Sequence, residues 1–239
     1  MGCMKKRGSH VGIALSFGIF IIFLVFLLSA LNPLIKIQKN RQHILDDLKN
    51  KMMNLSSENL TTLTIYVNKN VNKDCINING ITSYLPDEKL RVRNRLYEIL
   101  PYEIQNDNKL YVKVGNGFDG FLKIYSSGKI SSLEEGINGC TPILLGDYSI
   151  EVLTTQEYYS DDGIIETIEK YNTNYAGLKE DLGIPEGTDF GFNFTYSNGT
   201  MIGTEDEPAS TSVYSDQSYM LYIDSDGNIN VGDLTMRIW

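Results

Sequence analysis

The strongest constraint on this chain is an uncharged apolar segment near its N-terminus. Residues 11–31 read VGIALSFGIFIIFLVFLLSAL, which is 21 residues without a charged side chain. As a helix rising about 1.5 Å per residue, this segment is roughly 30 Å long, which matches the hydrocarbon core of a bilayer. A buried helix of a soluble protein usually keeps a polar face over that length. The sequence therefore predicts one membrane-spanning anchor that contacts lipid through residues 11–31.

Basic residues before the anchor bear on its orientation. Lys5, Lys6 and Arg7 favour a cytoplasmic N-terminus, so the C-terminal part is expected on the outer side of the cell membrane. The main alternative is a cleaved secretory signal, because residues 28–30 (LSA) offer small residues for cleavage. The apolar run is longer than the core of an ordinary secretory signal, which favours the anchor.

An apolar helical stripe continues beyond the anchor. Pro33 is expected to kink or restart the helix, and apolar residues then recur at steps of three and four. The residues expected to pack along this stripe are Leu45, Leu48, Met52 and Leu55. The pattern predicts an anchor and amphipathic stalk over residues 9–54. The apolar face is expected to be covered either by the rest of the chain or by neighbouring copies.

The rest of the chain, residues 60–239, is predicted to be an acidic α+β head. Residues 56–239 carry 13 Lys/Arg against 28 Asp/Glu, a net charge of −15, which argues against binding to nucleic acid. Helices are expected over residues 87–100 and 166–182, where proline or glycine marks the ends. Strands are expected at residues 63–67, 110–114, 121–125, 148–153, 190–196, 219–223 and 229–238.

This order of elements predicts a mostly antiparallel β-sheet with two helices behind the long N-terminal helix. Residues 224–227 (DSDG) are a hairpin turn between the last two strands. Arg91, Arg93 and Arg95 are the only basic cluster of the head, and we interpret them as one solvated helix face.

Histidine is too scarce for most catalytic mechanisms. The chain has only His10 and His43, at the membrane entry and on the stalk, so the head lacks a Ser-His or Cys-His mechanism and histidine metal ligands. Carboxylate chemistry of the glycosidase kind remains open. The adjacent pairs at 134–135 and 161–162 resemble loop charges rather than a catalytic pair. We therefore expect no enzyme activity, no catalytic residue and no cofactor.

The acidic turn near the C-terminus is a weak candidate for calcium. Residues 224–230 read DSDGNIN, but an EF-hand loop needs glycine at its sixth position and glutamate at its twelfth. Counted from Asp224, these positions hold Ile229 and Thr235. A hairpin turn accounts for the segment better, so we expect no metal site.

Two cysteines of the head have two interpretations. Cys75 and Cys140 can form a disulfide in an oxidising exterior, or they can be two buried free thiols. Residue types alone leave both open.

The N-terminus as a unit resembles a class III, or prepilin-type, signal peptide. Lys5-Lys6-Arg7-Gly8 stands directly before Ser9 and the apolar helix. In that family a membrane peptidase cuts after the glycine, so the resemblance implies a leader of residues 1–8 and a mature chain that begins at Ser9. Bacterial-type pilins carry a glutamate at the fifth mature position, where this chain has Ile13.

The long helix leading into a β-rich head also looks like a type IV pilin. Residues 175–185 (YAGLKEDLGIP), 189–192 (DFGF) and 231–239 (VGDLTMRIW) are similar to small archaeal membrane proteins with such N-termini. The resemblance implies a cell-surface protein with a structural, assembly or adhesion role. It implies a prepilin-type peptidase as a partner, with further copies or other pilin-like subunits as assembly partners.

Two other functions remain open. One is a monomeric, membrane-tethered domain outside the cytoplasm that binds a small molecule or glycan for a sensor or transporter. The other is a membrane-anchored hydrolase. A pocket with convergent polar groups would favour the binding domain.

Overall fold

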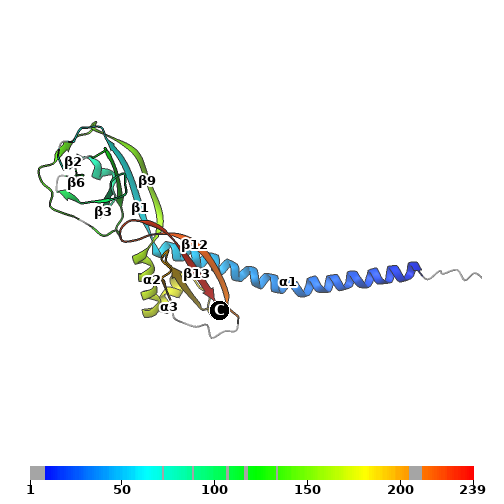
Figure 1. Ribbon diagram of the computed structural model, residues 1–239. Coiled ribbons are helices and arrows are strands. Elements are labelled where there is room, and N and C mark those ends of the chain that lie inside the picture. Colours follow the sequence, from blue (N-terminus) through cyan, green and yellow to red (C-terminus); the bar gives the residue numbers. More distant parts are fainter. Residues whose placement is uncertain are drawn as a thin grey trace, which may run out of the picture.

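The computed structural model describes residues 9–71, 73–87, 89–105, 108–115, 118–132, 134–204 and 212–239. One helix, α1 (Ser9–Ser56), leads into the head, and Figure 1 shows its first half extending away from all other labelled elements. The helix predicted over residues 9–54 is present, and its backbone stays helical through Pro33. The predicted leader, including Gly8, lies outside the described residues.

The head is α+β, as predicted, but it contains two mixed sheets. Its strands are β1 (Ser57–Val67), β2 (Cys75–Asn79), β3 (Leu90–Arg93), β4 (Ile99–Leu100), β5 (Tyr102–Gln105), β6 (Lys109–Lys113), β7 (Phe121–Ser126), β8 (Thr141–Ile143), β9 (Tyr148–Ser160), β10 (Phe190–Thr195), β11 (Met201–Gly203), β12 (Tyr214–Ile223) and β13 (Ile229–Ile238). The larger sheet has the order β11-β10-β13-β12-β9-β1-β7-β3-β4, and the smaller has the order β5-β6-β2-β8. Of the strand pairings among the described residues, β12 with β9 and β2 with β8 are parallel, and the others are antiparallel.

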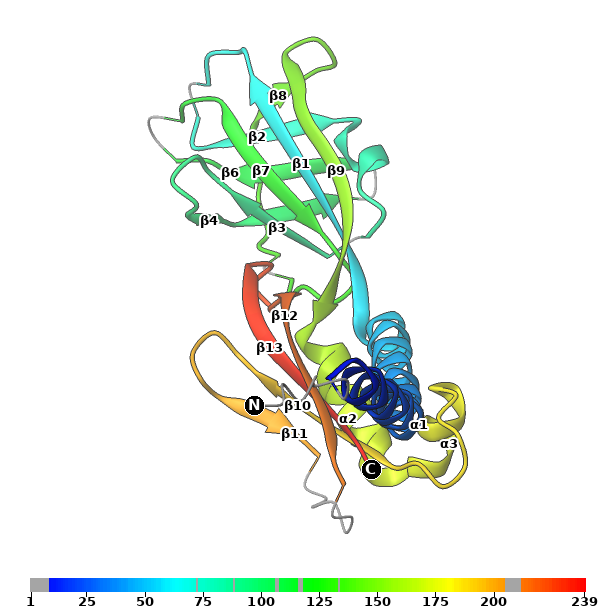
Figure 2. The ribbon, with the colours of Figure 1, turned by 90° about the vertical axis from the view of Figure 1, so that its right-hand side faces the viewer.

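Figure 2 shows that the head is built as two lobes joined by β1 and β9. We call the lobe that holds β2 to β8 and most of β1 and β9 the distal lobe. The proximal lobe holds α2 (Asp161–Thr173), α3 (Tyr175–Asp181), β10 to β13 and the second half of α1. β9 pairs along its length with β1 and then, at its C-terminal end, pairs in parallel with Tyr222 and Ile223 of β12.

Each lobe has its own apolar core. In the distal lobe, residues of β1, β3 and β7 such as Leu63, Val92 and Ile124 pack against the smaller sheet, and a short 3-10 helix (Ile81–Tyr84) closes one end. In the proximal lobe, Phe190, Phe192 and Phe194 project from one face of β10, as their alternation predicts, and pack against α1 and α2. The strand expected over residues 190–196 is therefore present as β10, and its phenylalanines share one buried face.

The predicted helix over residues 87–100 is wrong. The segment forms β3, a turn and β4. Asn94 explains the turn, because its side-chain oxygen accepts the backbone N–H groups of Leu96 and Glu98, and Tyr97 takes a positive φ of 64°. Such an Asx turn competes with helix formation. The prolines at the two ends of the segment, which indicated a helix, do not indicate this turn.

The expected solvated arginine face is wrong for the same reason. Arg91 and Arg93 lie on β3 and are buried, whereas Arg95 in the turn is exposed. All four residues of β3 are buried, because one strand face packs on the distal core and the other lies under a turn of the proximal lobe.

Two other expectations need adjustment. The single helix over residues 166–182 is two helices that meet at Asn174, whose side chain caps α3 by accepting the Gly177 N–H at 3.1 Å. The strands at 110–114 and 121–125 exist as β6 and β7, but they belong to different sheets. The C-terminal hairpin of β12 and β13 is confirmed.

Candidate functional site

The first functional surface is the anchor half of α1. Among the residues that the structure describes, one helix segment, Gly12–Leu31, is long and apolar enough to cross a membrane, and none of it is buried within the chain. Its large side chains face outward on every side of the helix; examples are Phe17, Ile22 and Phe26. An apolar surface of this size needs a covering, and lipid or other apolar helices can provide it.

The second half of α1 is fixed to the proximal lobe. Leu45, Leu48 and Met52 are buried in one cluster with Ile164 of α2 and the phenylalanines of β10. The predicted stalk packing is therefore present for these three residues, and the head of the same chain covers them. Leu55 corrects the prediction, because 42% of it is exposed. It lies in the last turn of α1, where the chain leaves the helix for β1.

Polar side chains of α1 reinforce this attachment. Arg41 stands in line with the apolar stripe, and its guanidinium lies 5.4 Å from the ring centre of Tyr214 on β12, a cation–π contact that gives the charge a partner there. The Lys51 ammonium donates to the carbonyl oxygen of Leu182 at 3.0 Å and pairs with Asp47 at 2.9 Å. The head is thus held to the anchor helix by a rigid, mixed contact rather than by a flexible linker.

A second connection joins the two lobes. The turn between β12 and β13 reaches from the proximal lobe onto β3 of the distal lobe. Arg91 Nη2 donates to Asp226 Oδ1 at 2.9 Å and to the Ser225 carbonyl oxygen at 3.3 Å. Arg93 Nη2 donates to the Asp226 carbonyl oxygen at 3.0 Å and to Asn228 Oδ1 at 2.7 Å. We call this contact the lobe joint.

The turn is preorganised for this contact by Asp224. One carboxylate oxygen of Asp224 accepts the backbone N–H groups of Asp226 and Asn228, and the other accepts the side-chain amides of Asn228 and Asn230. Both carboxylate oxygens of Asp224 therefore accept hydrogen bonds from within the turn. These bonds account for the aspartate at this position without a bound cation. Sequence reasoning missed the lobe joint, although Leu90 and Val92, alternating with two arginines, carry the period of a strand.

We expect Asp226→Asn to lower the free energy of unfolding by about 1–2 kcal/mol. The change leaves the guanidinium of Arg91, which is 1% exposed, without its counter-charge. Because Asp226 itself is about half exposed, the loss of stability is smaller than for breaking a fully buried ion pair. The measurement is denaturation of the detergent-solubilised chain, followed by circular dichroism.

Two variants control this experiment. Arg91→Met removes the charge together with its need for a partner, so Arg91→Met with Asp226→Asn is expected to be no less stable than Arg91→Met alone. Asp181→Asn breaks the exposed Lys170–Asp181 pair and is expected to change stability by only a few tenths of a kcal/mol. Equal losses of unfolding free energy for Asp226→Asn and Asp181→Asn would show that the lobe joint contributes no more stability than an exposed ion pair.

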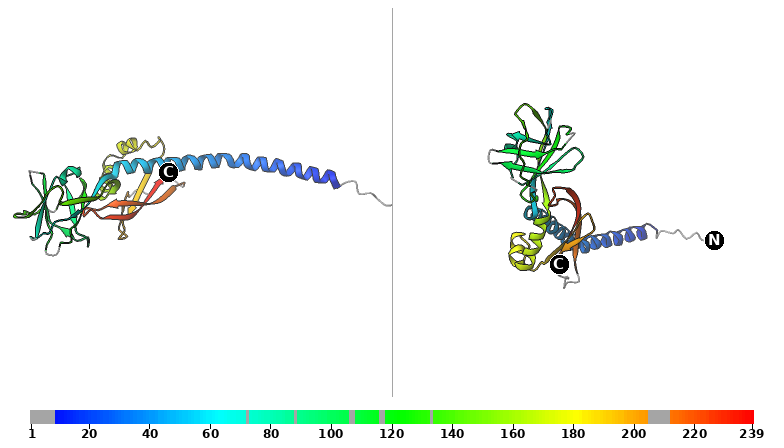
Figure 3. Two further views of the ribbon diagram at one scale, coloured as in Figure 1. Left: turned by 90° about the horizontal axis from the view of Figure 1, so that it is seen from above. Right: turned by 60° about the vertical axis from the view of Figure 1, so that its left-hand side comes forward.

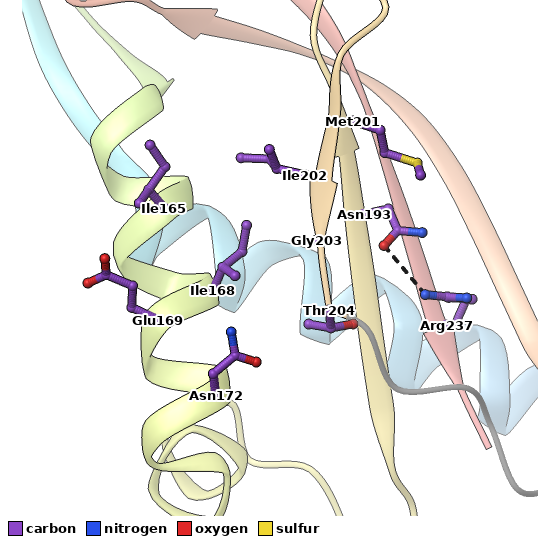
Figure 4. Close-up of a pocket in the computed structure, with 10 residues that line it drawn as sticks. All are labelled: Ile165, Ile168, Glu169, Asn172, Asn193, Met201, Ile202, Gly203, Thr204 and Arg237. Atoms are coloured by element: carbon purple, nitrogen blue, oxygen red, sulfur yellow. Dashed lines mark hydrogen bonds between the residues drawn. The ribbon is translucent and has the colours of Figure 1, made fainter.

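A groove lies at the edge of the proximal lobe. Its volume is about 860 Å³, and Figure 4 shows its lining residues on α2, on β10 and β11, and on β13. Ile165 and Ile168 of α2 lie on the side of the sheet that carries the phenylalanine core. Asn193 and Arg237 alternate with core residues on their strands, so they project from the opposite face. The groove therefore lies along the β11 edge of the sheet, and its polar groups come from both faces of the sheet.

The carboxylate pairs from the sequence are not brought together. Glu134 and Glu135 are exposed near β5, where Glu135 donates its backbone N–H to Tyr102. Asp161 and Asp162 start α2, and Asp161 accepts the Tyr196 hydroxyl, which raises the pKa of that tyrosine together with burial. Within the described ranges, no three His, Cys, Asp or Glu side chains are grouped to hold a metal ion.

One further carboxylate has a shifted pKa. Asp189 accepts the Lys179 ammonium at 3.0 Å and the Tyr175 hydroxyl at 2.9 Å, and these bonds hold the pKa of Asp189 below its usual value. The group links α3 to the start of β10. Its position between structural elements indicates a role in stability.

Cys75 and Cys140 form a disulfide in the structure, with their Cα atoms 4.8 Å apart. The strands explain the pairing, because β2 and β8 run parallel with Ile76 opposite Thr141, which places the two preceding residues side by side. Of the two interpretations left open by the sequence, the structure contains the bonded one.

The stalk packing and the lobe joint thus hold the head in a fixed relation to an apolar helix that is long enough to cross a membrane. No protein-family model, curated protein or solved structure matches this chain.

Proposed function

We propose that this chain is a pilin-like, membrane-anchored surface subunit with a structural, assembly or adhesion role. The observation that carries the proposal is the division of one continuous helix into two halves. Residues 12–31 of α1 are apolar and uncovered, whereas Leu45, Leu48 and Met52 are buried in the head. A helix of this kind transmits any lateral contact in the membrane directly to the head.

The proposal includes an orientation and a processing step. The basic residues before the anchor favour a cytoplasmic N-terminus, and the proposal puts the head outside the cytoplasm. Cleavage between Gly8 and Ser9 by a prepilin-type peptidase would leave α1 at the very start of the mature chain. The uncovered helix would then be free to lie against lipid or against the same helix of neighbouring subunits. In this proposal the head has no catalytic role.

We expect the membrane-extracted chain to begin at Ser9. Intact-mass measurement and N-terminal sequencing on protein expressed in its native host test this directly. Gly8→Val, which removes the small residue at the cut, is expected to leave the full-length mass, and Gly2→Val is the matched control that should still be processed. A native mass that retains Met1 or Gly2 would remove the pilin interpretation, and a start at Leu31 would show an ordinary secretory signal.

The groove along the β11 edge favours a second candidate, a membrane-tethered binding domain. Its size lies within the range of small-molecule sites, although its polar groups are divided between two faces of the sheet. Native mass spectrometry separates the candidates, because a tethered binding domain can remain a monomer and a structural subunit must associate. A monomeric chain that retains a small molecule through extraction would favour the binding domain.

A further inference from the structure

One edge of β9 is open over most of its length. β9 pairs with β1 from Tyr148 to Tyr159, but its other edge pairs with β12 only at Tyr159 and Ser160. Among the described residues no strand pairs with that edge between residues 148 and 158. The backbone N–H and C=O groups that point outward there have no strand partner, which makes this edge a template for another strand.

The side chains along this edge are exposed and largely uncharged. Every residue from Ile150 to Glu157 is exposed, and the run IEVLTTQE contains no lysine or proline, the residues that commonly protect an edge. A bulge at Glu151 and the carboxylates of Glu151 and Glu157 are the protective features of the run. The eight residues are otherwise suited to strand addition.

The apolar layer of the distal lobe continues to this edge. Leu153 lies opposite the fully buried Leu63, and Ile150 lies opposite the fully buried Ile65. Leu153 is nevertheless 45% exposed, because the smaller sheet covers β1 and leaves β9 uncovered. A strand added beside β9 would therefore extend an existing apolar layer.

The orientation of α1 indicates which strand can be added. Figure 2 looks along α1 and shows the β7-β1-β9 part of the sheet with its broad face toward the viewer, with β9 at the rim. Two copies paired through antiparallel β9 strands are related by a twofold axis perpendicular to that face. This axis runs in the direction of α1, so both anchor helices would enter the same membrane from the same side.

The charges on the edge are compatible with self-pairing. The two carboxylates, Glu151 and Glu157, face each other only in the register centred on Thr154. Centring on Leu153 places Glu151 opposite Thr155, and centring on Thr155 places Glu157 opposite Leu153. Two of the three central registers thus contain no pair of like charges, although the head as a whole is strongly acidic.

We propose that β9 of one copy pairs in antiparallel fashion with β9 of a second copy in the same membrane, through residues 150–157. This pairing forms a twofold dimer by continuing the larger sheet across two chains. The proposal goes beyond the pilin-like function and needs only that α1 lies in the membrane. It does not depend on cleavage after Gly8.

Cysteine scanning of the full chain in membranes tests the pairing. In a Cys3→Ser background, single variants Val152→Cys, Leu153→Cys, Thr154→Cys, Thr155→Cys and Gln156→Cys are oxidised mildly and analysed without reductant. The expected result is a crosslinked homodimer with one maximum along the scan, at the residue nearest the twofold axis. Tyr219→Cys, on β12 and 78% exposed, is the matched control and is expected to crosslink at least about tenfold less.

A second variant tests the same edge without crosslinking. Leu153→Glu places like charges opposite each other in both of the registers that contain no like-charge pair, against itself when the pairing is centred on Leu153 and against Glu157 when it is centred on Thr155, and is expected to weaken dimerisation about tenfold or more. Because Leu153 is only partly covered within one chain, the thermal midpoint of the monomer is expected to change little. Gln156→Lys, on the opposite face of the strand, is a second variant of this edge, and its thermal midpoint is also expected to stay unchanged.

Crosslinking equal to the Tyr219→Cys control at all five positions would overturn the proposal, as would crosslinks to a different protein. Undiminished dimers in Leu153→Glu would also overturn it, because the contact would then lie elsewhere. Crosslinked dimers of a chain that keeps Met1 would support the β9 pairing and remove the pilin interpretation. Failure of the pairing can therefore be distinguished from failure of the proposed function.

Discussion

Leu48→Asp is expected to reduce the free energy of unfolding of the proximal lobe by at least about 4 kcal/mol. Leu48 is 1% exposed and lies between Leu45 and Met52 in the contact of α1 with the head. The substitution removes about 2 kcal/mol or more of apolar burial and leaves a polar group without a partner in an apolar cluster. Because small domains have only about 5–15 kcal/mol of stability, much of this lobe should separate from α1.

Leu55→Asp is the matched control for this variant. It makes the same chemical change two turns along the same helix, at a side chain that is 42% exposed. We expect a loss below about 1 kcal/mol. Trp239, the only tryptophan, exchanges backbone hydrogen bonds with Asp189 in the proximal lobe and provides the fluorescence signal for both variants.

The comparison also decides what covers the stripe. If neighbouring subunits and not the head held Leu48, the detergent-solubilised monomer would unfold at the same denaturant concentration in both variants, and assemblies alone would be lost. Equal midpoints for Leu48→Asp and Leu55→Asp would therefore contradict the packing in the structure.

Local periodicity in the sequence predicted the N-terminal helix and strand β10 well. The uncharged run of residues 11–31, the three-and-four spacing through Leu48 and the alternating aromatics of residues 190–194 each report one buried or exposed face of a single element. The turn at Asp224 was visible because its residue types have a local preference for turns. These features need no knowledge of distant contacts.

The lobe joint was not predictable in this way. Arg91 and Arg93 looked like surface charges, because arginine is seldom buried without a partner and their partner lies more than 130 residues away in the turn. The edge of β9 was also hidden, since residues 148–153 indicate a strand but not which of its edges is paired. The prediction that Leu55 is buried failed for a third reason. A helical stripe predicts burial only where the helix packs against another element, and Leu55 lies in the last turn of α1.

Removal of the Cys75–Cys140 disulfide is expected to cost the distal lobe about 4 kcal/mol. The bond closes a loop with a sequence separation of 65, and the chain-entropy model gives about this value for a loop of that length. It also holds β8, a three-residue strand at the end of the smaller sheet, against β2. The tested variant is Cys75→Ser with Cys140→Ser, and Cys3→Ser is the control because it removes a cysteine outside the head.

The two-lobe structure makes this expectation specific. Hydrogen exchange followed by mass spectrometry should accelerate in β2 and β8 of the double variant, because the edge strand loses its covalent attachment. The fluorescence transition of Trp239 should move much less, since that residue lies in the proximal lobe and the disulfide lies in the distal lobe. Free thiols at both positions in protein purified from the host, or unchanged exchange in β8, would contradict the prediction. A loss of stability in the Trp239 transition as large as that of the distal lobe would instead show that the two lobes unfold as one unit.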